Sequence, residues 1–196
     1  MPRKNVKEER RLQIFEALSV CLKEKSFEKT SIKDIAKVAG VNHGVLHYYF
    51  ESKESILLHY IDHVMEYYGS QFKEWLGAKD TSGCSRQDFI QEIFEFANSK
   101  ITLNKDLSRL FVEIWEIALY NPSVRKKLQQ TYSQWIGTIT SMIEGTSSDN
   151  INMEILSTAM VAFWEGMALF STIIDTRKLN IEGVLTGFQQ QILKLL

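Results

Sequence analysis

The sequence has little cysteine and little proline. Its 196 residues include two cysteines, Cys21 and Cys84, and two prolines. The cysteines form no metal-binding or redox motif, which excludes a disulfide framework and favours a reducing cytoplasm with free thiols. Because proline is scarce, long uninterrupted helices are permitted.

Long apolar runs and targeting signals are also absent. The longest apolar stretch, residues 159–170, contains Glu165 and has about 12 residues, too few to cross a bilayer. The N-terminal segment is charged, has no apolar centre and does not resemble a secretory signal. We therefore expect a cytoplasmic protein with no membrane partner.

Motifs of the common enzyme classes are missing too. The sequence shows no Ser-His-Asp arrangement, no glycine-rich phosphate loop and no HExxH zinc motif. We expect no enzyme activity and no cofactor.

Helical periodicity, in contrast, runs nearly from end to end. Apolar residues recur three and four positions apart in about nine segments, and no segment alternates with period two for long enough to predict a strand. This pattern predicts an all-α fold of about nine helices. We place an N-terminal helix-turn-helix domain at residues 1–55 and a helical effector-binding and dimerisation domain at residues 56–196.

The charge is divided unevenly between these two parts. Residues 1–55 hold 11 Lys and Arg against eight Asp and Glu, whereas residues 56–196 hold 12 against 16. A basic end on an acidic body is typical of a small module that faces a polyanion.

The front part contains two short helical segments joined by "AGV" at residues 39–41. Ser31 followed by Asp34 is a capping-box pattern that opens the first segment. Asn42 is a favourable N-cap for the second segment, and Gly40 supplies the conformational freedom of the turn. Two short helices around a glycine-containing turn predict a helix-turn-helix unit.

The second short helix has two unlike faces. Leu46, Tyr49 and Phe50 share one face and suit packing on neighbouring helices. The opposite face has no acidic residue and suits insertion into a DNA major groove, which admits one α-helix. It consists of His43, Gly44, His47 and Tyr48, with positive charge nearby on Lys33, Lys37 and Lys53.

The stretch "TSIKDIAKVAGVNHGVLHYYFESKESIL" resembles the DNA-binding signature of the TetR family of bacterial repressors. The resemblance implies that Ser31, Tyr48 and Lys53 contact phosphate. It implies that Lys33, His43 and Gly44 face bases, and that Asn42 replaces the usual Ser cap. His47 stands where the family usually has tyrosine, and Val45 where threonine is frequent, so the resemblance does not give the operator sequence.

The four histidines fall in two pairs at i, i+4 spacing, His43 with His47 and His59 with His63. Two imidazoles at this spacing share a helix face and can hold a metal ion. No Cys or Glu completes an established ligand pattern, so we assign no metal site. The alternatives are a metal- or haem-sensing helical protein and a helical ligand carrier.

The C-terminal part ends in two helices, predicted near residues 151–174 and 181–195. The first is apolar on most sides, so the pair suits an intersubunit four-helix bundle around a twofold axis. Segments around "LFVEIWEIALYNPSV" and "AFWEGMALF" loosely resemble the BetI subgroup of the TetR family. The resemblance implies a homodimeric repressor that binds palindromic operator DNA and is released by a small-molecule effector of unknown identity.

Aromatic residues and one isolated charge mark a possible effector cavity in this part. Glu165 is the one charged residue in a run of about a dozen apolar residues, and a buried acid needs a partner. It could face a cationic effector, pair with an Arg, or lie at a hydrated dimer edge. The candidate cavity residues, each of which could instead belong to the core, are Phe94, Phe111, Trp115, Trp135, Met160, Trp164 and Glu165.

Overall fold

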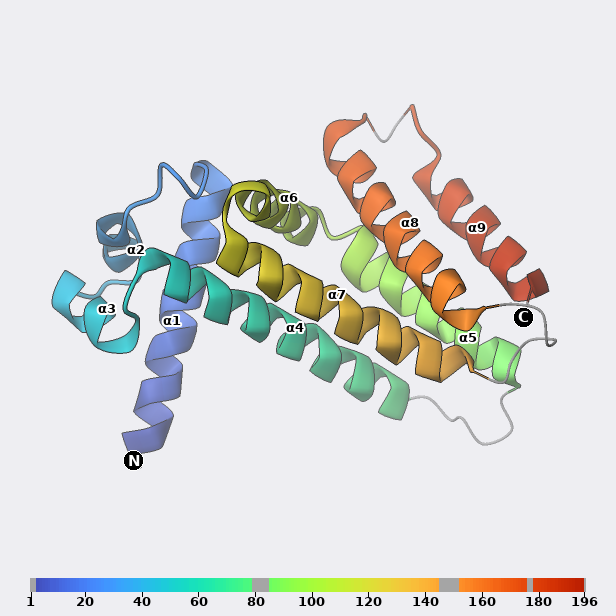
Figure 1. The fold of residues 1–196 in the computed structure, drawn as a ribbon, viewed down its shortest axis with the longest axis horizontal. Coiled ribbons are helices and arrows are strands. Elements are labelled where there is room, and N and C mark those ends of the chain that lie inside the picture. The colour runs from blue at the N-terminus through green and yellow to red at the C-terminus, as the bar shows by residue number, and fades with distance from the viewer. Residues whose placement is uncertain (1–2, 79–84, 145–151, 176–177, 196) are drawn as a thin grey trace. The chain divides into compact units, whose positions relative to one another are not determined.

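The computed structural model describes residues 3–78, 85–144, 152–175 and 178–195, and these ranges form helices without any strand (Figure 1). The all-α prediction is therefore confirmed. The helices are α1 (Arg3–Glu24), α2 (Ile32–Val38), α3 (His43–Tyr49), α4 (Lys53–Gly77), α5 (Arg86–Phe96), the π-helical turn η1 (Ala97–Thr102), α6 (Lys105–Tyr120), α7 (Pro122–Ile143), α8 (Met153–Ile173) and α9 (Ile181–Leu195).

The chain divides into two compact units that do not separate at residue 55. The first unit comprises residues 1–71 together with 113–127, and the second comprises 72–112 together with 128–196. The first unit extends past residue 55 because α4 continues without a break from Lys53. The division of function at residue 55 stays a prediction, since these units are defined by contacts alone.

Local capping explains why α2 and α3 begin where they do. The Ser31 hydroxyl accepts a hydrogen bond from the Asp34 backbone N–H at 3.2 Å, and the Asp34 carboxylate accepts one from the Ser31 N–H at 2.7 Å. The Asn42 side chain caps α3 by accepting a hydrogen bond from the Val45 N–H. Gly40 has φ of 62°, a left-handed conformation that favours glycine. The capping and turn predictions are confirmed.

Buried aliphatic and aromatic side chains hold the first unit together. The ring of Phe15 on α1 lies 5.6 Å from that of Phe50 and 5.8 Å from that of Tyr60. α3 is therefore fixed at its C-terminal end against α1 and α4. The largest fully buried side chains of this unit are Ile14, Leu18, Ile35, Leu46, Ile56, Leu57 and Ile61.

Hydrogen bonds from α6 and from the start of α7 also hold this unit together. The Phe27 N–H donates to the Glu113 carboxylate at 3.2 Å, and the Asn121 amide donates to the Glu54 carboxylate at 2.9 Å. The Asn121 side chain also accepts from backbone N–H groups at the start of α7, which confirms it as an N-cap. These contacts join segments that are far apart in the sequence.

The second unit packs α5, α7, α8 and α9 around one apolar core. Phe94, Ile143 and Met160 are completely buried within it. α8 is long and apolar enough to cross a membrane by length and composition alone, which corrects the sequence-based statement that no segment reaches that length. Met160 and Trp164 nevertheless bury one side of α8 in the core.

The sequence does not predict the π-helical turn η1, which follows α5 directly. It widens the backbone between Ala97 and Thr102, and the Asn98 side chain accepts a hydrogen bond from the Trp164 indole at 3.1 Å. This contact ties η1 to α8. Of the two cysteines, Cys21 is buried with a free thiol, and burial raises its pKa, while Cys84 lies outside the described residues.

Candidate functional site

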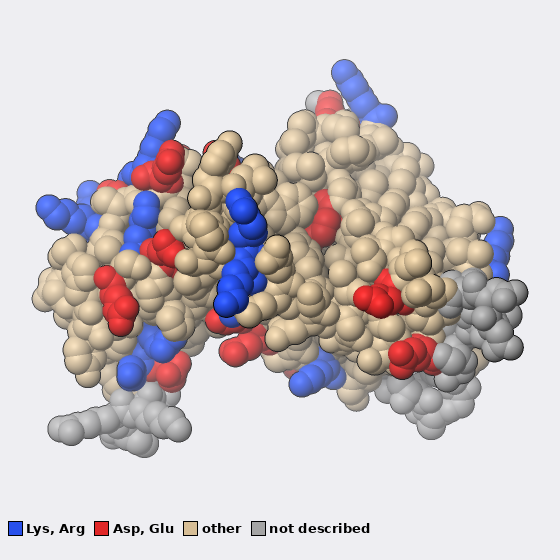
Figure 2. All heavy atoms as spheres, in the orientation of Figure 1, with Lys and Arg blue, Asp and Glu red and all other residues tan. Residues whose placement is uncertain are grey.

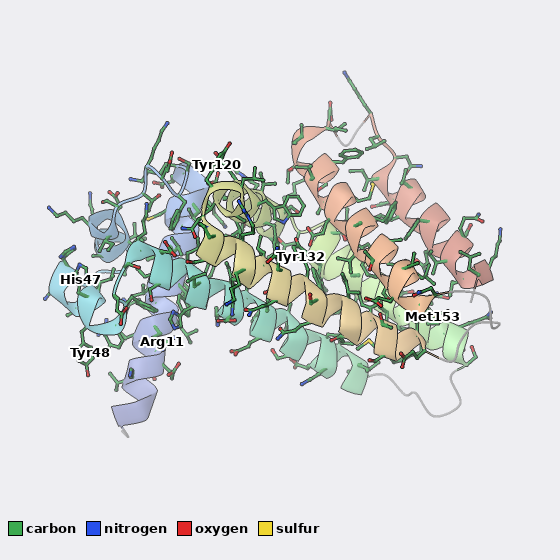
Figure 3. The ribbon with its side chains drawn as sticks, viewed as in Figure 1. Arg11, His47, Tyr48, Tyr120, Tyr132 and Met153 are labelled. Carbon is green, nitrogen blue, oxygen red and sulfur yellow. The ribbon has the colours of Figure 1, made fainter. Side chains whose placement is uncertain are left out.

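The α3 helix presents one buried face and one exposed face. Leu46 is 0% exposed and Phe50 is 2% exposed, whereas Tyr48 is 78% exposed. His47 and Tyr48 extend away from the rest of the unit (Figure 3). His43 and Gly44 are exposed as well, so the predicted base-facing residues share one open surface. We call the surface formed by His43, Gly44, His47 and Tyr48 the reading face.

The two histidines of the reading face touch each other. Their Nε2 atoms lie 3.3 Å apart, their ring centroids lie 4.5 Å apart, and the ring planes are inclined by 75°. The two rings therefore approach each other most closely at their Nε2 atoms, and their centres lie farther apart.

Cationic side chains lie beside the reading face on α2. Lys33 and Lys37 are exposed, and on the face drawn in Figure 2 the first three helices carry basic and acidic groups interspersed. The Asp34 carboxylate pairs with Lys25 at 2.8 Å, and this contact holds the pKa of Asp34 well below its usual range. Since Lys25 neutralises Asp34, the α2 surface keeps the positive charge of its two exposed lysines.

Lys53 has a different environment from the one predicted. Its ammonium donates to the carbonyl oxygens of Phe27 at 2.7 Å and Thr30 at 2.9 Å, and it lies 4.2 Å from the centroid of the Phe27 ring. Partial burial lowers the pKa of Lys53. The side chain closes the turn between α1 and α2, so its predicted phosphate contact requires it to share or leave these carbonyls.

Ser31 and Asn42 both serve as helix caps. The Ser31 hydroxyl donates to Asp34 at 2.7 Å in addition to accepting from its N–H, and the Asn42 side-chain oxygen accepts from the Val45 N–H at 2.8 Å. Removing either cap costs about 1 kcal/mol of helix stability in typical proteins. Their predicted DNA contacts are thus combined with a structural role.

The second histidine pair is divided between different partners. His59 Nδ1 contacts the Ser55 carbonyl oxygen at 2.7 Å, while the His63 ring stacks on Phe15 with centroids 5.3 Å apart. Among the described residues, no group of three or more His, Cys, Asp or Glu side chains is placed to hold a metal ion. The two histidine pairs therefore have the same sequence spacing but different side-chain contacts.

An aromatic cavity lies inside the second unit. Its volume is about 10 Å³, close to the space one water molecule needs. Four of the predicted residues line it, namely Phe111, Trp135, Trp164 and Glu165; the remaining walls are Ile101, Leu107, Ser108 and Ala168. Phe94 and Met160 are instead fully buried core residues, and Trp115 belongs to the first unit.

Glu165 is the one acidic side chain in the wall of this cavity. Burial raises its pKa to about 7, and a hydrogen bond with Tyr132 on α7 opposes that shift. Tyr132 extends from the middle of α7 (Figure 3). The carboxyl group is therefore poised to exchange its proton near neutral pH, and a cation in the cavity would favour its charged form.

A larger hollow of the second unit is polar, and sequence reasoning missed it. Its volume is about 570 Å³, and it lies between the start of α6 and the end of α8. Lys105, Asp106, Arg109, Ser171, Thr172, Ile174 and Asp175 line it. Charged residues at helix ends are usual on a solvated surface, so the sequence carried no signal for this hollow.

Comparison with known proteins relates the helix-turn-helix segment to a known family. Residues 14–60, which run from the second half of α1 to the start of α4, match the family described as "Bacterial regulatory proteins, tetR family". The regulator BetI of Yersinia pestis (strain Pestoides F) is 25% identical over 130 residues, and that of Serratia proteamaculans (strain 568) is 27% identical over 131 residues. Residues 14–60 are a TetR-family DNA-binding segment. Both alignments cover 66% of this chain and 64% of the relative, so the chain spans less than two thirds of each BetI protein.

Solved structures share the TetR-family fold along nearly the whole chain. A TetR regulator from Haloarcula marismortui superposes with a TM-score of 0.78 at 18% identity, covering 94% of this chain and 98% of that one. A transcriptional regulator from Saccharomonospora viridis in complex with choline has a TM-score of 0.76 at 19% identity, covering 93% and 96%. FadR of Bacillus subtilis in complex with stearoyl-CoA has a TM-score of 0.75 at 15% identity, covering 94% and 98%.

The reading face lies within the matched segment, whereas the aromatic cavity lies outside it. The helix-turn-helix prediction thus rests on both motif and geometry. The predicted roles of the individual residues in DNA or effector contact stay predictions.

Proposed function

We propose that this TetR-family chain is a cytoplasmic repressor that binds palindromic operator DNA as a homodimer and is released by a small-molecule effector. The observation that carries the proposal is the one-sided α3 helix, which buries Leu46 and Phe50 and exposes His43, His47 and Tyr48. A helix with one face packed in its own domain and the opposite face exposed suits insertion into a DNA major groove.

In this proposal, residues 1–55 act as the DNA-binding domain. Imidazole nitrogens donate to and accept from base edges, so His43 and His47 read sequence, while Gly44 allows close approach. Lys37 supplies attraction to the phosphate backbone, which makes binding salt-dependent, while Lys33 lies where it can reach bases. Ser31, Tyr48 and Lys53 orient α3 through phosphate contacts, and Asn42 caps the helix.

Residues 56–196 supply the dimer interface and the effector site. α8 and α9 expose apolar side chains, and few charges cover these helices on the face drawn in Figure 2. Pairing them across a twofold axis buries this surface and spaces two reading faces about 34–36 Å apart, one turn of DNA. The exposed apolar residues are Ile155, Phe170, Ile173, Val184 and Leu195.

The aromatic cavity suits a compact organic cation as effector. Trp135, Trp164 and Phe111 offer aromatic faces, and Glu165 offers a carboxylate. The Saccharomonospora viridis neighbour was solved with choline, which makes choline a suitable first probe. At about 10 Å³ the cavity must widen to admit it, and this movement gives the effector a means to favour one conformation over another.

Selection from a randomised duplex pool tests the DNA-binding proposal. We expect the purified chain to enrich a palindrome, and His43→Ala to change the preferred bases while His59→Ala, at the exposed histidine of α4, leaves them unchanged. Lys37→Ala should weaken binding to all duplexes and reduce its salt dependence. Failure to enrich any duplex would reject the proposal.

Thermal shift with choline tests the effector proposal through ligand-linked stabilisation. We expect choline to raise the melting temperature of the wild-type chain and to release the selected duplex. Trp164→Leu should remove both effects, whereas Arg109→Ala, in the polar hollow, should retain them. The opposite pattern would place the effector in the polar hollow.

A further inference from the structure

We infer that His43 and His47 form a bidentate site for a tetrahedral divalent metal ion such as zinc on the reading face. Both side chains are exposed on successive turns of α3. Their Nε2 atoms are 3.3 Å apart while their ring centroids are 4.5 Å apart, so the nitrogens converge toward a common point.

The spacing of the two nitrogens matches zinc coordination. Zinc binds imidazole nitrogen at about 2.0–2.1 Å, and two such ligands at a tetrahedral angle lie ~3.3–3.4 Å apart. As a hydrogen bond, 3.3 Å is long, because N–H donors usually approach their acceptors to about 2.7–3.2 Å. The observed distance therefore fits a shared metal ion as well as it fits a long hydrogen bond.

Binding requires only a change of tautomer in a neutral pair. One ring carries its proton on Nε2 when the two nitrogens share a hydrogen bond. Moving that proton to Nδ1 frees the second Nε2 lone pair, and both lone pairs then point to the metal ion. The metal ion keeps two positions for water, because the described residues place no third His, Cys, Asp or Glu in a metal-binding group. We therefore expect reversible binding rather than a structural zinc site.

The other histidine pair provides a control at the same spacing. His59 Nδ1 is engaged with the Ser55 carbonyl, and His63 stacks on Phe15. Sequence spacing alone gives both pairs equal metal affinity, whereas the structure favours His43 and His47. The contrast between the pairs is what the experiment measures.

Zinc loading has a consequence for DNA binding, and this step rests on the proposed function. The two Nε2 atoms that would bind zinc are also nitrogens with which the reading face would contact bases. One nitrogen cannot serve both partners, so zinc and operator DNA compete. By linkage, the factor by which zinc weakens DNA binding equals the factor by which DNA weakens zinc binding.

Zinc titration against a chromophoric chelator tests the metal site, using the full chain without a histidine tag. We expect one zinc per wild-type chain at this site, loss of that zinc in both His43→Gln and His47→Gln, and retention in His59→Gln. Nuclear magnetic resonance should show the ring protons of His43 and His47 shifting together as zinc is added. Equal zinc binding by wild-type and His43→Gln chains, or loss in His59→Gln, would overturn the site.

Fluorescence anisotropy with the selected duplex tests the competition. Zinc at saturation should lower the affinity of the wild-type and His59→Gln chains for the duplex at least tenfold, and a chelator should restore it. Zinc bound at His43 and His47 with unchanged DNA affinity would overturn the competition. A chain that binds zinc there and selects no duplex would instead overturn the proposed function while the metal site stands.

Discussion

Glu165→Gln should stabilise the chain above neutral pH and leave it unchanged in mild acid. Burial raises the pKa of Glu165 from 4.5 to about 7. Between these values the folded chain binds more protons than the unfolded chain, so the free energy of unfolding falls as the pH rises through this window. Glutamine retains an oxygen that accepts from Tyr132 but cannot ionise.

The expected difference in the free energy of unfolding follows from the pKa shift of Glu165. A difference of about 2.5 pKa units corresponds to about 3 kcal/mol, at about 1.4 kcal/mol for each unit. At pH 8 the variant should therefore unfold with a free energy up to about 3 kcal/mol higher than the wild type, or roughly 6–12 °C higher in melting temperature for a chain of this size. Near pH 4.5 the two should be nearly equal.

Denaturant unfolding at fixed protein concentration, followed by circular dichroism from pH 4.5 to 8.5, measures this difference. Glu74→Gln, at an exposed position on α4, is the matched control and should change little at any pH. A Glu165→Gln variant that is less stable than the wild type at pH 8 would refute the reasoning, because it would mean that the carboxylate has a favourable cationic partner.

Three further predictions concern other parts of the chain. Choline should raise the wild-type melting temperature more at pH 8 than at pH 5.5, and Glu165→Gln should remove this pH dependence, since only the carboxylate attracts the cation. Lys53→Met should lower the free energy of unfolding by about 1–3 kcal/mol without DNA present, because the carbonyls of Phe27 and Thr30 lose their charged donor. Gly40→Ala should destabilise by about 1 kcal/mol or more, measured by the same unfolding assay, because its φ of 62° disfavours a Cβ.

Sequence reasoning succeeded where the determinants are local. The caps at Ser31 and Asn42 each depend on residues within three positions, and both are present in the structure. The two faces of α3 follow from helical geometry alone, so the burial of Leu46 and the exposure of Tyr48 were predictable.

Contacts between distant segments were not predictable in the same way. Lys53 reaches carbonyl groups more than 20 positions earlier, whereas the family resemblance predicted it as a phosphate ligand. Glu165 could be recognised as an unusual charge, but its partner Tyr132 lies on another helix. The aromatic residues also could not be divided between core and cavity, because Phe94 and Phe111 are equally apolar and differ only in their neighbours.

The small volume of the aromatic cavity sets a condition on effector affinity. If only a fraction of molecules has the cavity open, the observed dissociation constant equals the intrinsic one divided by that fraction. Raising an open population from about 1% to about 10% would tighten every ligand about tenfold. Core residues behind the wall, such as Phe94 with its ring 5.2 Å from that of Trp164, can therefore adjust the effector concentration to which the regulator responds without changing which molecule it recognises.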